Sequence, residues 1–533
     1  MTKRTIFTVS SINGKYNLED ARRNEDSTEA TFETAISATG FGKFNYFILV
    51  LSIPCGCASM MATTSMSYVA PAAHCDLDLN LQQRGMLNAI TYIGMISSAL
   101  AWGFLADTLG RKKILVVGYL TDAIFVTIAG LAQTYDMLLI TKLITGVIMN
   151  GPFAALTTAV SEFHSAKYRA KVLMGLGVMY SFAQLIIPAL AWSVIPQRMD
   201  YKFFDGYLKL HSWNIFILIC AVPSIICSIG HSFIPESPKF LMTVGRNDEA
   251  LLVLKKVYHY NTGLDPKTFP VKSLIDETKL NIGGKHGGLV TANRTKVQAL
   301  KEGLQQIAPM FFPPYILKIA LVATIQSGFM TGANTLRLWL PQIFTAINDY
   351  QVLHPNITAS LCAMLGIIKP DDSLNSTECV VNHLSDSIYI NAMIVSATAV
   401  IGYSIAGIAI NRIGKKPSII VLSLISGAAV TSLYFAQNSP TTVALAAINI
   451  TAIGICCNIE LTIVVDTFPT TLRAIAVSIT LMIGRCGAML GNLLFPYLLE
   501  IGCLPPFLFI GCVIISCSFL SIFLPKTDMK ALE

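Results

Sequence analysis

Twelve stretches of this 533-residue chain are apolar over the roughly 20 residues that a helix needs to cross about 30 Å of hydrocarbon. Only 13% of the residues are charged, against roughly 25% in an ordinary soluble protein, so most of the apolar surface must face lipid. A segment in lipid has to satisfy its own backbone hydrogen bonds, and we therefore expect twelve transmembrane helices in an all-α, polytopic membrane protein. The expected spans are 44–73, 84–106, 113–132, 137–161, 171–195, 213–234, 315–343, 387–410, 417–436, 441–465, 474–498 and 503–524.

The basic residues are unequally distributed between the segments that join these spans. With the N-terminus in the cytosol, 30 of the 38 Lys and Arg residues fall on the cytosolic side and five on the opposite side. This excess is typical of cytosolic loops, so both termini are expected in the cytosol. The net charge of +7 follows from this topology and does not indicate a nucleic-acid partner. We expect a monomer in the plasma membrane or in an intracellular vesicle membrane.

The two halves of the chain repeat one another at an offset of 304 residues. The repeated pairs are Gly103 with Gly407, Asp107 with Asn411, Gly110 with Gly414, Glu162 with Asp466, and Arg169 with Arg473. Each half thus carries an acid, six residues and an arginine on the cytosolic side, between its fourth and fifth spans. The repeat predicts two pseudo-symmetric six-helix bundles in parallel orientation. The expected divisions are a cytosolic tail over 1–43, bundles over 44–234 and 315–525, a central cytosolic loop with short helices over 235–314, and a tail over 526–533.

Several of these motifs carry a family resemblance. The stretches "GFLADTLGRKK" (103–113) and "PESPKFL" (235–241), with the two acid-six-arginine motifs, resemble the major facilitator superfamily. "HSW" (211–213) and "LWLP" (338–341) are similar to the branch of synaptic vesicle glycoprotein 2 and the organic-ion transporters. The resemblance implies the major facilitator fold, with a substrate site near the midplane between the bundles.

Two functions are open on these motifs. The first is secondary active or facilitative transport of a small organic solute, expected to be an organic ion, as a symporter or uniporter driven by a solute gradient or a coupled proton. The alternative is a non-transporting membrane glycoprotein that serves trafficking or acts as a receptor; the uncharged first span and Asn411 in place of an acid favour it. No phosphate-binding loop or metal-ligand spacing is recognisable, so we expect no enzyme, metal or cofactor.

A cytosolic gate is expected at the repeated motifs. Its members in the first half are Gly103, Asp107, Gly110, Arg111, Glu162 and Arg169, and in the second half Asn411, Asp466 and Arg473. The resemblance implies that Asp107 contacts the opposite bundle near a helix N-terminus, which attracts negative charge, when the cytosolic side is closed. The alternative is that the basic residues only anchor topology and that Asp107 only caps a helix.

Ionisable residues inside spans are costly and mark candidate sites for substrate or coupling. The candidates are Asp122, Lys142, Arg337, Glu460 and Arg485, with Trp339 as an aromatic ring that a flat substrate could stack on. Arg485 can bind an anionic group bidentately or pair permanently with Glu460. Lys142 with Gly146 resembles an Arg-x-x-x-Gly motif that the family links to proton coupling. Structural pairing of Asp122, snorkelling of Arg337 and ordinary packing of Trp339 are the alternatives.

The loop 344–386 is expected on the outer side. It holds two glycosylation sequons, at Asn356 and Asn375, and two cysteines, Cys362 and Cys379. In an oxidising compartment these cysteines either pair with each other or remain free thiols.

Overall fold

The computed structural model describes residues 29–275 (apart from 198, 204 and 206), 308–354, 359–366 and 385–525. Eleven helices or helix pairs in this part of the chain are long and apolar enough to cross a membrane. The second expected span forms a further helix, α4 (Leu81–Leu109), whose 29 residues extend about 44 Å. The fold is therefore mostly helical and follows the expected order of spans.

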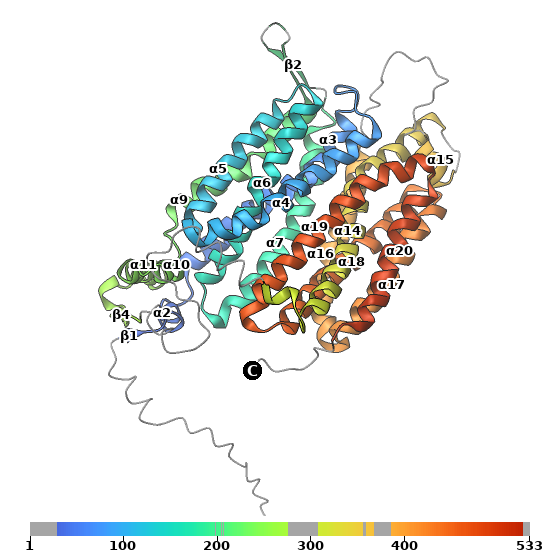
Figure 1. Cartoon of the computed structure of the whole chain (residues 1–533). Coiled ribbons are helices and arrows are strands. Elements are labelled where there is room, and N and C mark those ends of the chain that lie inside the picture. Colours follow the sequence, from blue (N-terminus) through green and yellow to red (C-terminus); the bar gives the residue numbers. More distant parts are fainter. Residues whose placement is uncertain are drawn as a thin grey trace, which may run out of the picture.

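The first bundle comprises six long helical segments (Figure 1). They are α3 (Lys43–Ala72), α4, α5 (Arg111–Gly130), α6 (Tyr135–Glu162), α7 (Ala166–Val194) and α8 (Ser212–Cys220) continued by α9 (Val222–Phe233). Those of the second bundle are α14 (Ile316–Leu353), α16 (Asp386–Ile413), α17 (Lys415–Ser432), α18 (Ser439–Thr467), α19 (Thr470–Ile501) and α20 (Leu504–Leu520). Across the halves, α3 packs on α14, α4 on α19, and α7 on α16.

The repeat is visible in the turns at the end of the bundles that is expected to face the cytosol. Gly110 joins α4 to α5 with φ of 85°, and Gly414 joins α16 to α17 with φ of 93°. These backbone angles are strained for any residue with a Cβ, so both halves need glycine at the same offset position. The tight turn expected at Gly110 is thus present in both copies.

Short elements cover the two ends of the bundles. At the end expected in the cytosol, α10 (Pro238–Thr243), α11 (Asn247–Thr262), a 3₁₀ turn (Pro266–Thr268) and β4 (Ser273–Leu274) follow the first bundle, and a 3₁₀ turn (Ala308–Phe311) precedes α14. At the opposite end, β2 (Asp200–Phe203) and β3 (Leu208–His211) form an antiparallel hairpin, and α15 (Leu361–Leu365) lies in the loop after α14. Two more 3₁₀ turns, Leu433–Phe435 and Ser521–Phe523, end α17 and α20.

The last part of the expected N-terminal tail is folded. Residues Glu29–Ala30 form β1, which pairs in parallel with β4, and Phe32–Ala38 form helix α2. Phe32 and Ile36 of α2 are buried against Leu241 and Leu254 of α10 and α11. This apolar contact, which the polar composition of the tail did not indicate, fixes the segment beneath the first bundle (Figure 1).

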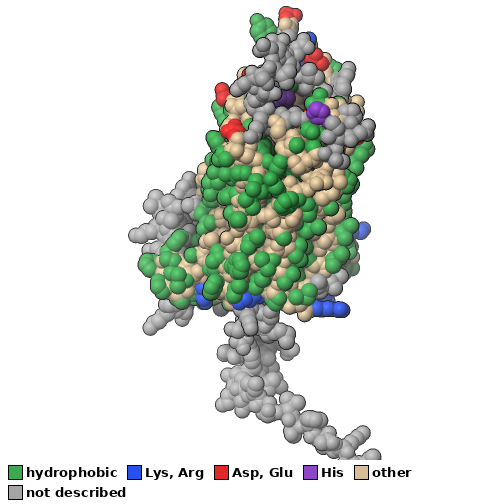
Figure 2. Space-filling model, turned by 90° about the vertical axis from the view of Figure 1, so that its right-hand side faces the viewer, with side chains coloured by type: hydrophobic (Ala, Val, Ile, Leu, Met, Phe, Trp, Pro, Cys, Tyr) green, Lys and Arg blue, Asp and Glu red, His purple; other side chains and the backbone are tan. Residues whose placement is uncertain are grey.

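Charge and apolar surface are separated as a bilayer requires. On the face shown in Figure 2, hydrophobic side chains cover the middle, Lys and Arg gather at the lower edge, and acidic side chains lie near the top. The lower edge corresponds to the end of the molecule where α10 and α11 lie in Figure 1. This distribution agrees with the basic excess expected on the cytosolic side.

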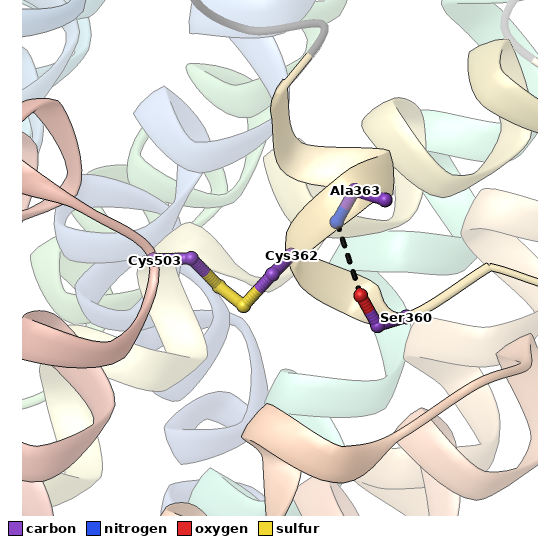
Figure 3. Close-up of a disulfide and its surroundings, with 4 residues drawn as sticks. All are labelled: Ser360, Cys362, Ala363 and Cys503. Atoms are coloured by element: carbon purple, nitrogen blue, oxygen red, sulfur yellow. Dashed lines mark hydrogen bonds between the residues drawn. A yellow bond between two sulfur atoms is a disulfide. The ribbon is translucent and has the colours of Figure 1, made fainter.

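The outer loops of the second bundle are joined by a disulfide, and its pairing corrects the sequence-based expectation. Cys362 in α15 is bonded to Cys503, just before α20, with 5.4 Å between their Cα atoms (Figure 3). The expected partner, Cys379, lies outside the described residues, as do the sequons at Asn356 and Asn375. Ser360 caps α15 by accepting a hydrogen bond from the Ala363 amide at 3.4 Å. The true partner is 141 positions away and becomes a neighbour only when α15 folds over the end of α19.

Candidate functional site

Five polar side chains from both bundles lie near the middle of their helices, at the interface between the bundles. Arg485 of α19 donates to Asn150 Oδ1 of α6 at 2.5 Å. Arg337 of α14 donates to Asn334 Oδ1 at 2.6 Å, and Tyr92 of α4 donates to the same oxygen at 3.1 Å. We call Tyr92, Asn150, Asn334, Arg337 and Arg485 the inter-bundle polar cluster. It connects α4 to α14 and α6 to α19.

The position of this cluster follows from helix geometry. Arg485 is near the midpoint of the 32-residue α19, and Asn150 is near the midpoint of the 28-residue α6. Helix α19 packs closely against α14: a Cβ at Gly487 would lie 2.1 Å from the Ser327 carbonyl oxygen. This close packing places Arg485, two residues before Gly487, next to α14. The small residues flanking Arg485 therefore serve the close packing that the sequence predicted.

Glu460 does not pair with Arg485. Its side chain on α18 is fully buried in the second bundle, and neither carboxylate oxygen has a hydrogen-bond partner within the described part of the chain. Gln326 of α14 is equally buried and also without side-chain partners there. Arg485 instead bonds Asn150 across the bundle interface, so the alternative of a permanent Glu460–Arg485 pair is wrong.

Lys142 and Asp122 lie inside the first bundle. Lys142 Nζ on α6 donates to the Ala62 carbonyl at 3.1 Å and to Ser65 Oγ at 3.2 Å, both on α3. Asp122 Oδ2 on α5 accepts a hydrogen bond from Ser224 Oγ of α9 at 2.6 Å. Each buried charge thus binds a neighbouring helix of the same bundle, and both are almost completely shielded from solvent.

Trp339 lies in the core of the second bundle. Its ring is 1% exposed and its centroid lies 4.8 Å from that of Phe495, at an interplanar angle of 30°. This environment is that of a packed aromatic pair.

The two bundles are held together in their outer halves. Trp192 of α7 donates to Asp386 Oδ1 of α16 at 2.9 Å, and Gln82 at the start of α4 donates to Glu500 near the end of α19. One apolar core includes outer residues of both bundles, whereas the cytosolic half of the first bundle has a separate core. Near the cytosolic ends of α4 and α16, a Cβ at Gly103 or Gly407 would meet nothing within 4 Å. The two inter-bundle hydrogen bonds named here thus lie at the same end of the helices, opposite the turns at Gly110 and Gly414.

Residues 77–369 match the family model of sugar (and other) transporters, and residues 378–532 match that of the major facilitator superfamily. The chain belongs to the sugar (and other) transporter family of the major facilitator superfamily. Its membership agrees with the repeat and with the two bundles.

Curated relatives of this chain include synaptic vesicle glycoproteins. The rat synaptic vesicle glycoprotein 2B is 33% identical over 284 residues, which are 51% of this chain and 41% of the relative. The human synaptic vesicle glycoprotein 2A is 31% identical over 244 residues, 45% of this chain and 32% of the relative. The chain thus matches less than half the length of these relatives.

Solved structures with the same fold are transporters. The partially occluded inward-open xylose transporter XylE of E. coli has a TM-score of 0.62 and 16% identity, covering 92% of this chain and 99% of XylE. Its inward-open form has a TM-score of 0.62 and 14% identity, covering 90% and 96%. At this identity the likeness establishes the major facilitator fold.

Equivalent ion pairs occur at the expected cytosolic end of each bundle. Arg111 Nη2 lies 3.2 Å from Glu162 Oε1, and Lys415 Nζ lies 2.5 Å from Asp466 Oδ2. The two pairs are related by the 304-residue offset, which would have identified Lys415 as the counterpart of Arg111. Of the expected gate residues, Arg111, Glu162 and Asp466 therefore pair within their own bundles. The side chains of Asp107 and Asn411 lie outside the described part of the structure.

Glu236 of the "PESP" stretch completes the first-half motif. Its Oε1 accepts hydrogen bonds from the backbone amides of Arg111 at 2.9 Å and Lys112 at 3.0 Å, at the N-terminus of α5. Unpaired amides and the helix dipole favour a carboxylate at this position. The motif resembles a family signature in sequence, but its spacing alone does not indicate a partner for Glu236.

Arg169 and Arg473, the arginines of the two repeated motifs, have different environments. Arg169 donates to Glu33 Oε2 of α2 at 2.9 Å, and the Ala166 amide donates to Glu33 Oε1 at 2.5 Å. Burial alone would raise the pKa of Glu33, but these hydrogen bonds and the nearby charges of Arg169 and Lys239 lower it below 4.5. Arg473 Nε is buried without a partner among the described residues. The N-terminal segment therefore makes the two halves unequal.

Proposed function

We propose that this chain is an alternating-access transporter that moves a small organic solute across its membrane through the inter-bundle polar cluster. The observation that carries the proposal is the meeting of polar side chains from both bundles near the membrane midplane. Secondary transporters of this architecture bind substrate between their two halves, where each half can change its contacts as it rocks.

The observed conformation supports this mechanism. The hydrogen bonds that join the bundles near their expected outer ends fit one end state of a rocking cycle, the state that is closed on the outer side. In the opposite state the outer contacts Trp192–Asp386 and Gln82–Glu500 must break. The gate at Asp107 is then expected to form on the cytosolic side. Each of these hydrogen bonds contributes only a modest free energy, so the two bundles can still alternate between two states.

The energy source is proposed to be the solute gradient or a coupled proton. Solved structures with this fold include a D-xylose–proton symporter, which is 15% identical to this chain with a TM-score of 0.62. The match covers 92% of this chain and all of the symporter. Lys142 and Asp122 are the buried titratable groups of the first bundle that a coupled proton would use. A monomer in the plasma membrane or a vesicle membrane, with both termini in the cytosol, is the proposed setting.

The experiment is uptake into proteoliposomes that contain the full chain. A panel of a neutral sugar (D-xylose), organic anions and organic cations is compared for native protein and Arg485→Ala. Saturable uptake that Arg485→Ala abolishes supports transport through the cluster. Imposing a proton gradient in the same vesicles separates proton coupling from facilitated diffusion.

The second candidate is a non-transporting membrane glycoprotein. It is favoured by the similarity to synaptic vesicle glycoproteins 2A and 2B and by the first span, α3, which has no charged residue after Lys43. If no member of the panel shows saturable uptake, this candidate replaces transport. Labelling of single cysteines from each side of sealed vesicles tests the proposed orientation in either case.

A further inference from the structure

Among the ionisable groups in the middle of the described spans, those at the interface between the bundles are positively charged, and no negative charge among them lies there. Asp122 and Lys142 have opposite charges and are both buried in the first bundle. Glu460 is buried inside the second bundle. Arg337 and Arg485 are the two that reach the inter-bundle polar cluster, where both are mostly buried but keep some exposure.

Neither arginine of the cluster has an acidic partner. Within the described residues, every carboxylate lies more than 4.0 Å from both guanidinium groups. Their observed acceptors are the amide oxygens of Asn334 and Asn150, which satisfy hydrogen bonds but carry no charge. An unneutralised charge is expensive in a membrane interior, and a guanidinium cannot become neutral there.

The surroundings of the two arginines suit an organic molecule. Arg337 lies within electrostatic range of the hydroxyls of Tyr68 and Tyr403, and Arg485 within range of Tyr92. Guanidinium groups bind carboxylates with two parallel hydrogen bonds, and aromatic rings pack on flat apolar bodies. A neutral sugar would supply hydroxyl groups but would leave both charges uncompensated.

We infer that the substrate of this transporter is a small organic anion whose carboxylate is bound by Arg485 and Arg337 in the inter-bundle polar cluster. This inference rests on the proposed function, because it assigns the substrate class of the same site. Both arginines belong to the second bundle, so the anion binds mainly to that half. The first bundle faces it with the neutral side chains of Tyr92 and Asn150.

The geometry also connects binding to movement. The Arg485–Asn150 hydrogen bond joins α19 to α6 across the interface. A carboxylate is a stronger acceptor for a guanidinium than an amide oxygen, so it displaces Asn150 from Arg485. Binding of the anion thereby removes one contact between the bundles and favours the change of state. Asn150→Ala removes this contact before the anion binds, so it is expected to weaken the dependence of the conformational change on the anion.

The test uses two probes of matched shape, benzoate and benzamide, with succinate and D-xylose as further ligands. The full chain is purified for thermal stabilisation and reconstituted for uptake. Benzoate is expected to stabilise the protein and to enter saturably, whereas benzamide does neither. Arg485→Gln and Arg337→Gln should each reduce benzoate binding by about tenfold or more, the usual effect of losing a charge-assisted hydrogen bond.

Matched variants separate charge from folding. Arg485→Lys keeps the charge and is expected to retain part of the binding, while Arg246→Gln, in an exposed pair on the cytosolic side, leaves it unchanged. Equal binding of benzamide and benzoate, or benzoate and succinate effects that survive both arginine substitutions, would overturn the inference. The anionic substrate is likewise overturned if neither anion stabilises the protein or enters the vesicles.

The outcomes also distinguish the inference from the proposed function. Saturable D-xylose uptake that is lost in Arg485→Ala, without any effect of the anions, supports transport and overturns the anionic substrate. Stabilisation by benzoate that depends on Arg485, without flux of any probe, supports the anion site and overturns transport.

Discussion

Arg169 donates a hydrogen bond to Glu33 at 2.9 Å, and this contact joins the repeated cytosolic motif of the first bundle to the segment before the first span. Arg169 also donates to the carbonyl oxygens of Ser161 and His164, so it closes the turn between α6 and α7. In the second bundle, by contrast, Arg473 Nε is buried without a hydrogen-bond partner among the described residues. The N-terminal segment therefore binds one of the two arginines that the sequence assigns to the expected gate.

The first prediction concerns Glu33→Gln. Removing the charge weakens the bond to Arg169, and a partly exposed ion pair contributes about 1 kcal/mol or less, so opening of residues 29–42 should increase by up to roughly fivefold. Hydrogen–deuterium exchange of that segment measures the change. Glu249→Gln is the matched control, because Glu249 forms its ion pair with the exposed Arg246 at the start of α11. Equal exchange in the two variants would show that Glu33 does not anchor the segment.

The second prediction concerns pH and His164. Burial lowers the pKa of His164 below 6.5; the hydrogen bond to the Val160 carbonyl opposes this shift, and the charge of Arg169 adds to it. Its stabilising contribution is present above pH 6.5 and is lost as pH falls toward the lower folded-state pKa, because the open turn then binds the proton more readily. Amide exchange over residues 160–170, corrected for the intrinsic effect of pH on exchange, should therefore show more opening at about pH 5.5 than at about pH 7.5. In His164→Gln this difference should disappear; its persistence would assign the effect to another group.

The membrane helices and their repeat could be predicted from sequence because both depend on local patterns. Apolar length determines a span in lipid, and the constant offset relates Arg111–Glu162 to Lys415–Asp466 without knowledge of the fold. Such regularities survive in the structure because each pair lies within one bundle, where the repeated helices have the same arrangement.

Other contacts could not be read from the sequence because they depend on packing between distant segments. The seven-residue α2 is too short to form alone, and its stability comes from α10 and α11. The choice of Asn150 rather than Glu460 as the partner of Arg485 depends on the rotation of α18 and α19 about their axes. Hydropathy does not specify that rotation.

The third prediction concerns the cytosolic gate. Asp107→Asn should shift the population toward inward-open states and slow transport, because the closed state loses an anion near a helix N-terminus. Accessibility of single cysteines from the cytosolic side measures the shift. Asn411→Ala is the control, since the second motif has no charge to lose at the equivalent position. Unchanged accessibility in Asp107→Asn would count against the gate.

The fourth prediction tests whether Gly146 is needed for the close packing of α6 against α4. A Cβ at this position would lie 2.2 Å from the Thr91 carbonyl oxygen, where α6 crosses α4. Gly146→Ala should therefore destabilise the protein by about 1–3 kcal/mol, as overpacked cores generally do. Gly177→Ala is the control, because a Cβ there meets nothing within 4 Å and alanine favours a helix by up to about 1 kcal/mol. Melting in detergent distinguishes them, and equal melting temperatures would contradict the close contact.

The fifth prediction concerns the Cys362–Cys503 disulfide. It connects α15 to the start of α20 across 141 positions, so its loss should destabilise the second bundle by about 2–4 kcal/mol. Cys362→Ser, Cys503→Ser and the double variant should then melt at the same temperature, because each removes the same bond. Cys512→Ser serves as the control, since that thiol is free and exposed on α20. Additive losses in the double variant would mean that the two cysteines stabilise the bundle separately, and the outer loops would then require a different connection.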